Sequence, residues 1–474
     1  MVSELNFWDG EVWSFVVTLA ILLGAMLVAN CLRQNIRFIR KSLIPSPVLG
    51  GFIALAADAV FKLIFGHSMF EISTLEALTY HGLGLGFVAL AWRHTEKIKG
   101  KKARRDVFFT STVTVGGYLL QGMVGLIITI VLFYLIGSYA AGGVLLPMGY
   151  GQGPGQAYNW GHTFEMYQDY ESFTHGTSFG LTVAAMGFIA ASIGGVLFLN
   201  KLRMAGDKRA LNDDNETVED LTAEQITGKN EIPLAESMDK MTVQVGLVFI
   251  TYFISYAAMY GVTLLLDKGG SFVVNTIKPL LWGFNFLVGT AFAVLFKGIG
   301  NGLRKKGIMQ REYTNNFMLN RFSGLMFDIM VVASIAAIDL SAFRYKEFWL
   351  PLLLVCVAGA FATYFYTFWI CNRLFPDYKD EMFLAMYGML TGTASTGIIL
   401  LREIDPQFNT PASHNIIYQN LWSIILGAPM LLLMGFVARS MTWTWITLGA
   451  IVVLFAGMLF IQSRRIKKYK DETE

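Results

Sequence analysis

Two short polar segments rich in glycine interrupt long apolar stretches of this sequence. The first covers 147–161 and reads Pro-Met-Gly-Tyr-Gly-Gln-Gly-Pro-Gly-Gln-Ala-Tyr-Asn-Trp-Gly; the second covers 388–397 and reads Gly-Met-Leu-Thr-Gly-Thr-Ala-Ser-Thr-Gly. Glycine lets a backbone approach a ligand closely, and free peptide N–H groups where a turn enters a helix bind anions. Carbonyl, amide and hydroxyl oxygens bind hard cations such as sodium. We therefore expect the binding chemistry of the protein in these two segments.

The candidate substrate-binding residues combine glycines and carboxamides in the first segment with hydroxyls in the second. They are Gly151, Gln152, Gly153, Gly155, Gln156, Asn159, Thr391, Thr393, Ser395, Thr396 and Arg402. Arg402 has the planar donor group that grips a carboxylate through two parallel hydrogen bonds. Two alternatives stay open: small residues also serve tight helix packing in membranes, and Arg402 would equally serve as an interfacial anchor paired with Glu403 or Asp405.

Four side chains carry oxygen atoms suited to a coupling cation: Asn159, Asp328, Thr393 and Ser395. Asp328 lies inside an apolar run, where an ionisable group costs roughly 2.5–3.5 kcal/mol on insertion scales. It is expected to face a cavity, a cation or a basic partner, although a buried structural hydrogen bond would also account for it. Sodium is the only metal expected, because the 3 cysteines and 6 histidines lack the spacing of a metal site.

The composition is that of a membrane protein. The 474 residues are 54% hydrophobic and 15% charged, with a mean hydropathy of +0.50, whereas soluble domains carry about 25% charged residues. The net charge of +3 is small, and the basic residues cluster in short loops. We therefore expect a lipid bilayer and no nucleic acid among the partners.

Eleven apolar runs are long enough to cross a bilayer, which takes about twenty residues. They are 12–31, 43–65, 76–93, 106–137, 177–200, 243–265, 276–297, 322–340, 350–374, 414–437 and 444–463. Lys and Arg gather after the first, third, fifth and seventh runs and at the end of the chain. Because such loops stay in the cytoplasm, we expect the N-terminus outside and the C-terminus in the cytoplasm.

The two halves of the chain match each other in plan, since each has five runs with a glycine segment before the fifth. The first half begins outside and the second inside, so the halves are expected to be inverted repeats, as in many secondary transporters. The predicted fold is an all-α polytopic membrane protein with two inverted five-helix repeats, each with a re-entrant hairpin, and an extra C-terminal transmembrane helix. The boundaries are 1–200 with a hairpin at about 138–165, a cytoplasmic linker over 201–242, 243–437 with a hairpin at about 384–405, and 438–474 for the extra helix and its basic tail.

Three features together resemble the bacterial glutamate:sodium symporter family. They are the early stretch Ile44-Pro-Ser-Pro-Val-Leu-Gly-Gly51, the Gly-x-Gly-x-Gly pattern of the first segment with the second segment at 388–397, and the order and inversion of the apolar runs. The resemblance implies ten-helix protomers with two re-entrant hairpins, sodium-coupled uptake of glutamate or a related acid, and homodimers in the bacterial inner membrane. It also implies a mobile core, carrying the hairpins, that moves against a dimerising scaffold.

The leading hypothesis is a sodium-coupled symporter that imports an amino-acid or dicarboxylate anion by alternating access, with sodium as coupling ion and no other cofactor. The alternative is an ion or small-solute channel, because two hairpins that meet at the midplane also describe pores. An enzyme is not expected. The sequence contains neither an HExxH motif nor a GxxxxGK[ST] nucleotide-binding loop.

Overall fold

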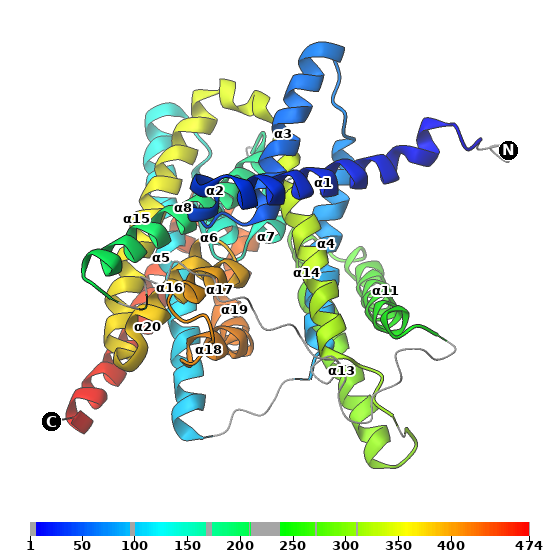
Figure 1. Ribbon diagram of the computed structural model, residues 1–474. Coiled ribbons are helices and arrows are strands. Elements are labelled where there is room, and N and C mark those ends of the chain that lie inside the picture. Colours follow the sequence, from blue (N-terminus) through cyan, green and yellow to red (C-terminus); the bar gives the residue numbers. More distant parts are fainter. Residues whose placement is uncertain are drawn as a thin grey trace. The chain divides into compact units, whose positions relative to one another are not determined.

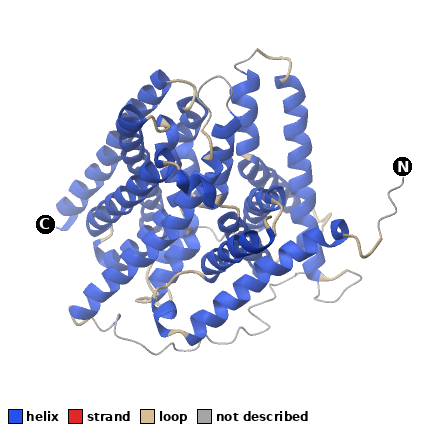
Figure 2. Cartoon of the chain, turned by 90° about the horizontal axis from the view of Figure 1, so that it is seen from above, coloured by secondary structure: helices blue, strands red, loops and turns tan. Residues whose placement is uncertain are grey.

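The computed structural model describes residues 6–94, 100–166, 173–207, 209, 238–270, 273–309 and 311–473. These residues form helices joined by turns and loops, and they contain no β-strand (Figures 1 and 2). The all-α fold class is therefore confirmed over the described part of the chain.

Nine of the described helices are long and apolar enough to cross a membrane. They are α1 (Gly10–Asn35), α3 (Ser46–Phe65), α5 (Lys101–Ile136), α8 (Gly176–Met204), α11 (Lys240–Leu266), α13 (Asn285–Lys305), α14 (Asn316–Ala336), α15 (Lys346–Leu374) and α20 (Met441–Thr473). A tenth candidate is the pair α18 (Ala412–Tyr418) and α19 (Asn420–Val437), which is bent by 52°. The protein is thus a polytopic membrane protein.

Shorter helices connect the long ones. They are α2 (Arg37–Lys41), η1 (Ala140–Val144), α6 (Leu145–Tyr150), α7 (Pro154–Met166), η2 (Val273–Ile277), α12 (Lys278–Gly283), η3 (Leu340–Arg344), η4 (Pro376–Tyr378), α16 (Lys379–Thr391) and α17 (Ala394–Arg402). One further helix, α4 (Ile72–Trp92), has the length of a span. It carries Glu76 and His81 and is less apolar than the nine. The predicted run 76–93 corresponds to this helix.

The helices fall into two compact units. Unit 1 comprises Met1–Leu75, Ile98–Asp213 and Val332–Glu474, and unit 2 comprises Glu76–Lys97 and Asp214–Val331. Each unit therefore draws on both halves of the chain. The assignment of 1–200 and 243–437 as inverted repeats stays a prediction, and residues 210–237 of the predicted linker lie outside the described residues.

Unit 1 is built around α5 and α8. Helix α5 packs against α15, α19 and α20, while α8 packs against α6, α7 and α16 (Figure 1). The extra C-terminal helix is fastened to this core by a buried carboxamide, because Gln462 Nε2 donates to Thr112 O and to Tyr366 Oη, both at 3.0 Å. Helix α20 is therefore an integral part of unit 1.

Unit 2 has its own apolar core, in which α4 meets α11, α13 and α14. Its buried residues include Val88, Val248, Ala293 and Phe322. At the end of α4, the Trp92 indole N–H donates to Thr251 Oγ1 at 3.0 Å. Such buried polar contacts satisfy groups that lipid cannot.

Candidate functional site

The first glycine segment forms a break between two helices. Helix α6 ends at Tyr150, and α7 begins at Pro154. Between them Gly153 has φ +85°, a left-handed conformation that glycine adopts without strain. Proline suits the first position of α7 because it lacks the N–H that a helix start leaves unbonded. The turn 151–153 is therefore encoded locally by its glycines and its proline.

The second glycine segment forms a similar break. Helix α16 ends at Thr391, and α17 begins at Ala394. Thr393 is the residue before α17, and its Oγ1 accepts from the backbone N–H of Thr396 at 3.5 Å. A threonine in this position caps the start of a helix, so this break is also specified by local sequence.

The two turns lie next to each other. A Cβ atom placed on Gly153 would lie 3.4 Å from Thr393 Cγ2, an ordinary van der Waals distance. The residues come from opposite halves of the chain, and both belong to unit 1. Consequently four helix termini lie close to Gly153 and Thr393: the starts of α7 and α17 and the ends of α6 and α16.

Helix α8 packs closely against both breaks. A Cβ on Gly187 would lie 2.3 Å from Thr391 O and 2.9 Å from Tyr150 Cδ1, closer than such atoms can approach. One turn earlier on α8, Val183 packs closely against Gly149, because a Cβ added to Gly149 would lie 2.7 Å from Val183 Cγ1. The glycines are therefore needed for the helices to meet, as the packing interpretation of these residues requires.

Helix α5 contacts the carbonyl groups at both helix ends. The Tyr118 hydroxyl donates to Gly151 O at 3.1 Å. One turn later Gln121 Nε2 donates to Leu390 O at 2.8 Å and to Thr363 Oγ1 at 2.9 Å. Neither residue was predicted from the sequence, although a glutamine such as Gln121 within an apolar run was a usable signal.

The predicted residues of the first segment lie at or just after the turn. Gly151, Gly153 and Gly155 are buried, and Gln152 is partly exposed. Gln156 and Asn159 lie on α7 with exposed fractions of 2% and 4%. Neither the oxygen nor the nitrogen of the Gln156 carboxamide has a hydrogen-bond partner among the described residues. Buried amides are normally bonded, so this group is a candidate for contact with a ligand.

The predicted residues of the second segment divide into two sets. Thr391 and Thr396 are buried, and the Thr391 hydroxyl is bonded to Tyr387 O of its own helix at 2.6 Å. Thr393 lies at the turn, and Ser395 is exposed in the first turn of α17. Arg402 is at the far end of α17.

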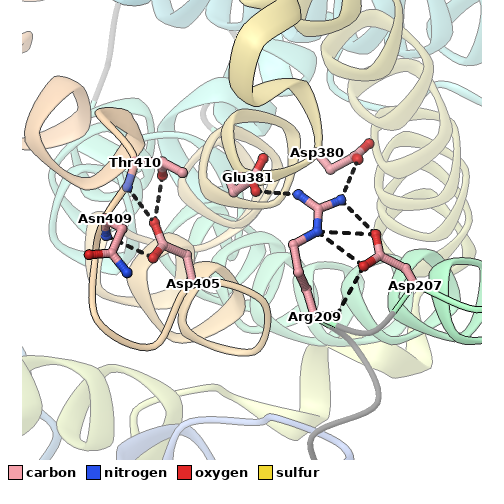
Figure 3. Close-up of polar contacts among 7 residues, drawn as sticks. All are labelled: Asp207, Arg209, Asp380, Glu381, Asp405, Asn409 and Thr410. Atoms are coloured by element: carbon pink, nitrogen blue, oxygen red, sulfur yellow. Dashed lines mark hydrogen bonds and ion pairs between the residues drawn. The ribbon is translucent and has the colours of Figure 1, made fainter.

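Arg402 is exposed and stands over the ring of Phe408, with 5.5 Å from its guanidinium carbon to the ring centre. The neighbouring Asp405 carboxylate accepts hydrogen bonds from the backbone N–H groups of Asn409 and Thr410 (Figure 3). The structure thus brings most of the predicted set together at the turns, whereas Arg402 lies one helix length away from them.

Asp328 belongs to unit 2, whereas the two turns belong to unit 1. It is an exposed residue of α14 and lines a cavity of about 510 Å³ with Asn320 and Arg321 of the same helix. A charged side chain at membrane depth does not face lipid without a large cost. This polar face of α14 is therefore expected to meet water or protein.

A cluster of charges fixes the start of α16. Arg209 bonds to Asp207 at 2.6 Å, to Asp380 at 3.2 Å and to Glu381 (Figure 3). Asp380 and Glu381 lie in the first turn of α16, where carboxylates favourably oppose the helix dipole. Hydrogen bonds from Arg209 hold the pKa of Asp207 below its usual value, although partial burial opposes the shift.

The fold and this geometry define a class: a polytopic helical membrane protein in which two broken helix pairs meet within one unit. Among the described residues, no three or more His, Cys, Asp or Glu side chains are grouped as a metal site. The oxygen ligands at the turns are carbonyls, hydroxyls and amides, a set that suits a hard monovalent cation rather than zinc.

Comparison with known proteins places the chain among particular relatives. No protein-family model matches the sequence. The chain is similar to the sodium/glutamate symporter of Escherichia coli (strain K12), with 25% identity over 401 residues that cover 82% of this chain and 88% of the symporter. The sodium/glutamate symporter of Shigella flexneri gives the same values. These similarities confirm the predicted resemblance to the sodium/glutamate symporters, at a low level of identity.

Proposed function

We propose that this protein is a sodium-coupled secondary transporter that imports glutamate or a related amino-acid or dicarboxylate anion. The observation that carries the proposal is the close proximity of Gly153 and Thr393. It unites two breaks of membrane helices from opposite halves of the chain, which is the arrangement of substrate sites in many transporters. The relatives named sodium/glutamate symporter support the ion and the substrate class.

The helix starts of α7 and α17 would bind the anion. Each start has backbone N–H groups without partners in its own helix and carries the positive end of the helix dipole. Because the starts of α7 and α17 lie close together, each would bind one carboxylate group of a dicarboxylate substrate. Gln156, whose carboxamide has no hydrogen-bond partner in the described part of the chain, and Ser395, which is exposed at the start of α17, would contribute side-chain hydrogen bonds.

The helix ends of α6 and α16 would favour the cation, because their carbonyl oxygens carry the negative end of the helix dipole. Asn159, Thr393 and Ser395 offer further oxygen ligands, and a cation role of Asp328, a residue of unit 2, stays a separate prediction. A sodium ion and an anion bound beside each other attract, so each would raise the affinity for the other to the same extent. This reciprocity is the physical basis proposed for coupled import.

Uptake into proteoliposomes tests the function. Purified protein is reconstituted, and the initial uptake of radiolabelled glutamate is measured with an inward sodium gradient or with choline in place of sodium. We expect saturable uptake that depends on sodium and is inhibited by excess unlabelled substrate; aspartate, glutamine and succinate as competitors define the substrate class. Sodium-independent uptake would refute the coupling. Conductance that does not saturate with solute concentration would instead favour a channel.

The movement is proposed to be of the elevator type, with the hairpins at about 138–165 and 384–405 re-entering the membrane in a homodimer of inverted-repeat protomers. Both turns belong to unit 1, so one rigid movement of that unit would carry the whole site. Spin labels at the exposed residues Tyr134, Met204 and Ile308 test this, with Cys31 replaced by serine. We expect the distance between Met204 and Ile308, which joins the two units, to change with sodium and glutamate. The distance between Tyr134 and Met204, within unit 1, is expected to stay constant, and a change in this distance alone would refute the rigid movement.

A further inference from the structure

The carbonyl groups at the two breaks both lack a hydrogen-bond donor within their own helices. The last carbonyls of a helix lack partners within it, and at membrane depth no lipid group can bond to them. Gly151 O follows the end of α6, and Leu390 O lies in the last turn of α16. Each therefore needs a donor from elsewhere in the protein.

A single helix supplies both donors. Tyr118 and Gln121 stand three positions apart on α5, so their side chains leave the same face of the helix. The tyrosine hydroxyl donates to Gly151 O at 3.1 Å, and the carboxamide nitrogen of Gln121 donates to Leu390 O at 2.8 Å. The packing beside them is equally close, because a Cβ on Gly117 would lie 2.7 Å from Leu390 Cδ1.

The orientation of the Gln121 carboxamide is determined by its partner. Leu390 O can only accept, so the NH2 end of the amide must face it. The same nitrogen donates to Thr363 Oγ1 of α15 at 2.9 Å, and the Gln121 side chain is fully buried. A buried amide with two bonds to different helices has one arrangement and holds the end of α16 in a fixed place.

We propose that Tyr118 and Gln121 are positioning residues that hold the two breaks against each other. The proposal rests on the proposed function, in that the breaks are taken to form the transport site. Tyr118 fixes the turn 151–153 and Gln121 fixes the end of α16 next to Thr391. Because both side chains stem from one turn of α5, the two helix starts that bind the anion keep their mutual geometry. Loss of either donor lowers the fraction of protein in the competent arrangement, which raises the apparent KM in proportion.

Three substitutions test this, namely Tyr118→Phe, Gln121→Met and Gln121→Glu. Tyr118→Phe removes only the hydroxyl, and Gln121→Met keeps the length but removes the donors. We expect KM for glutamate to rise about threefold to tenfold in each, as for loss of one or two net hydrogen bonds, with kcat changed less than KM. Tyr134→Phe is the matched control, because Tyr134 is an exposed residue of the same helix; it should keep the parent KM.

Gln121→Glu adds a second measurement, the pH dependence of KM, which would not change if Gln121 only filled space. Its ionised carboxylate cannot donate to Leu390 O and repels it, whereas the protonated carboxyl group can donate. We expect KM of this variant, divided by that of the parent protein at the same pH, to fall as the pH is lowered from 8 to 5. The same ratio for Gln121→Met should not change with pH. A ratio that is independent of pH in Gln121→Glu would contradict the assigned hydrogen bond.

Hydrogen exchange separates this inference from the transport function. Exchange of the backbone amides is measured by mass spectrometry in the purified, full-length protein without substrate. We expect faster exchange around residues 151–153 in Tyr118→Phe and around 390–393 in Gln121→Met, with other segments unchanged. This result would support the positioning role even if the parent protein failed to transport glutamate. Unchanged exchange together with an unchanged KM in both variants would overturn it.

Discussion

Gly153 allows a sharp test, because the cost of replacing it can be worked out from its geometry. Its φ of +85° is one that residues with a Cβ rarely adopt. Among the described residues other than its chain neighbours, an added Cβ would meet only Thr393 Cγ2, at 3.4 Å. Alanine would thus suffer little crowding, and its cost is conformational, about 1–2 kcal/mol. Asparagine is larger but tolerates a left-handed backbone, so it should cost less than alanine. Valine is β-branched, which makes a positive φ worse, and its methyl groups add crowding.

The expected order of damage is therefore Gly153→Asn, then Gly153→Ala, then Gly153→Val. A cost of 1–2 kcal/mol corresponds to a KM about 5-fold to 30-fold higher for Gly153→Ala, if binding requires the native turn. Gly153→Val should abolish measurable transport while the protein still inserts into the membrane. Side-chain size alone would predict the opposite order for alanine and asparagine, so the pair distinguishes backbone conformation from bulk.

The assay is the initial rate of sodium-driven glutamate uptake into proteoliposomes over a range of glutamate concentrations, normalised to the reconstituted protein. Gly24→Ala in α1 is the matched control, because an added Cβ there meets no atom of another described segment within 4 Å. Thermal unfolding in detergent shows whether a variant has lost its fold rather than its site. A parent-like KM in Gly153→Ala and Gly153→Val would refute the requirement for this turn conformation. A larger defect in Gly153→Asn than in Gly153→Ala would show that crowding dominates.

Three further substitutions test other parts of the structure. Gly187→Ala forces a Cβ to within 2.3 Å of Thr391 O, and such overpacking costs about 1–3 kcal/mol. We expect the KM for glutamate to rise at least fivefold in uptake assays. An unchanged KM would argue against rigid packing of α8 on the breaks. Arg209→Gln should lower the Tm by a few degrees, since each partly exposed ion pair contributes at most about 1 kcal/mol. Because Arg209 lowers the pKa of Asp207, the contribution of this pair is present above the unfolded pKa and is lost as the pH falls through the lower folded value. The Tm difference should therefore be constant from pH 8 to 5 and shrink only below about pH 4, and a loss near pH 6 would contradict the assignment. Asp328→Asn should raise the sodium concentration for half-maximal uptake several-fold if Asp328 is a cation ligand, and an unaltered sodium dependence would exclude that role.

The positions of the helices were largely predictable, because a bilayer demands about twenty apolar residues from each span. The run 12–31 lies within α1, and the run 106–137 matches α5 closely. Boundaries were less predictable where polar residues belong to a helix. The run 322–340 was predicted too late, because α14 already begins at Asn316 and includes polar residues before its apolar part.

Interruptions of apolar runs were harder to predict than the runs themselves. The single run 276–297 proved to be two helices, α12 and α13, separated at Phe284. Gly283 precedes this break, and glycine favours helix ends. By contrast, the breaks at 151–153 and 392–393 were predictable, because glycine, proline and hydroxyl residues are concentrated there.

The partners of the breaks could not be predicted from spacing. Tyr118 and Gln121 precede the first turn by about thirty residues in sequence, and Leu390 lies in the other half of the chain. Their contacts arise from the packing of α5 against helices of both halves, which no local pattern records. Arg402 is close to the second segment in sequence, but the full length of α17 separates it from the turn, and its role in substrate binding stays a prediction. Proximity in sequence along a straight helix is therefore a poor guide to distance from the turn.

The contacts around the breaks also bear on how the site could move. Transporters expose a site either by opening a hairpin or by moving the whole site. Here the two turns lie next to each other, are bonded to α5 through Tyr118 and Gln121, and are packed on α8 at Gly187 without room for a methyl group. Opening one turn alone would break the hydrogen bond that joins its carbonyl to α5. Moving unit 1 as a body keeps all of these bonds. The energetics of the buried carbonyl groups thus favour movement of the intact site over the opening of either turn.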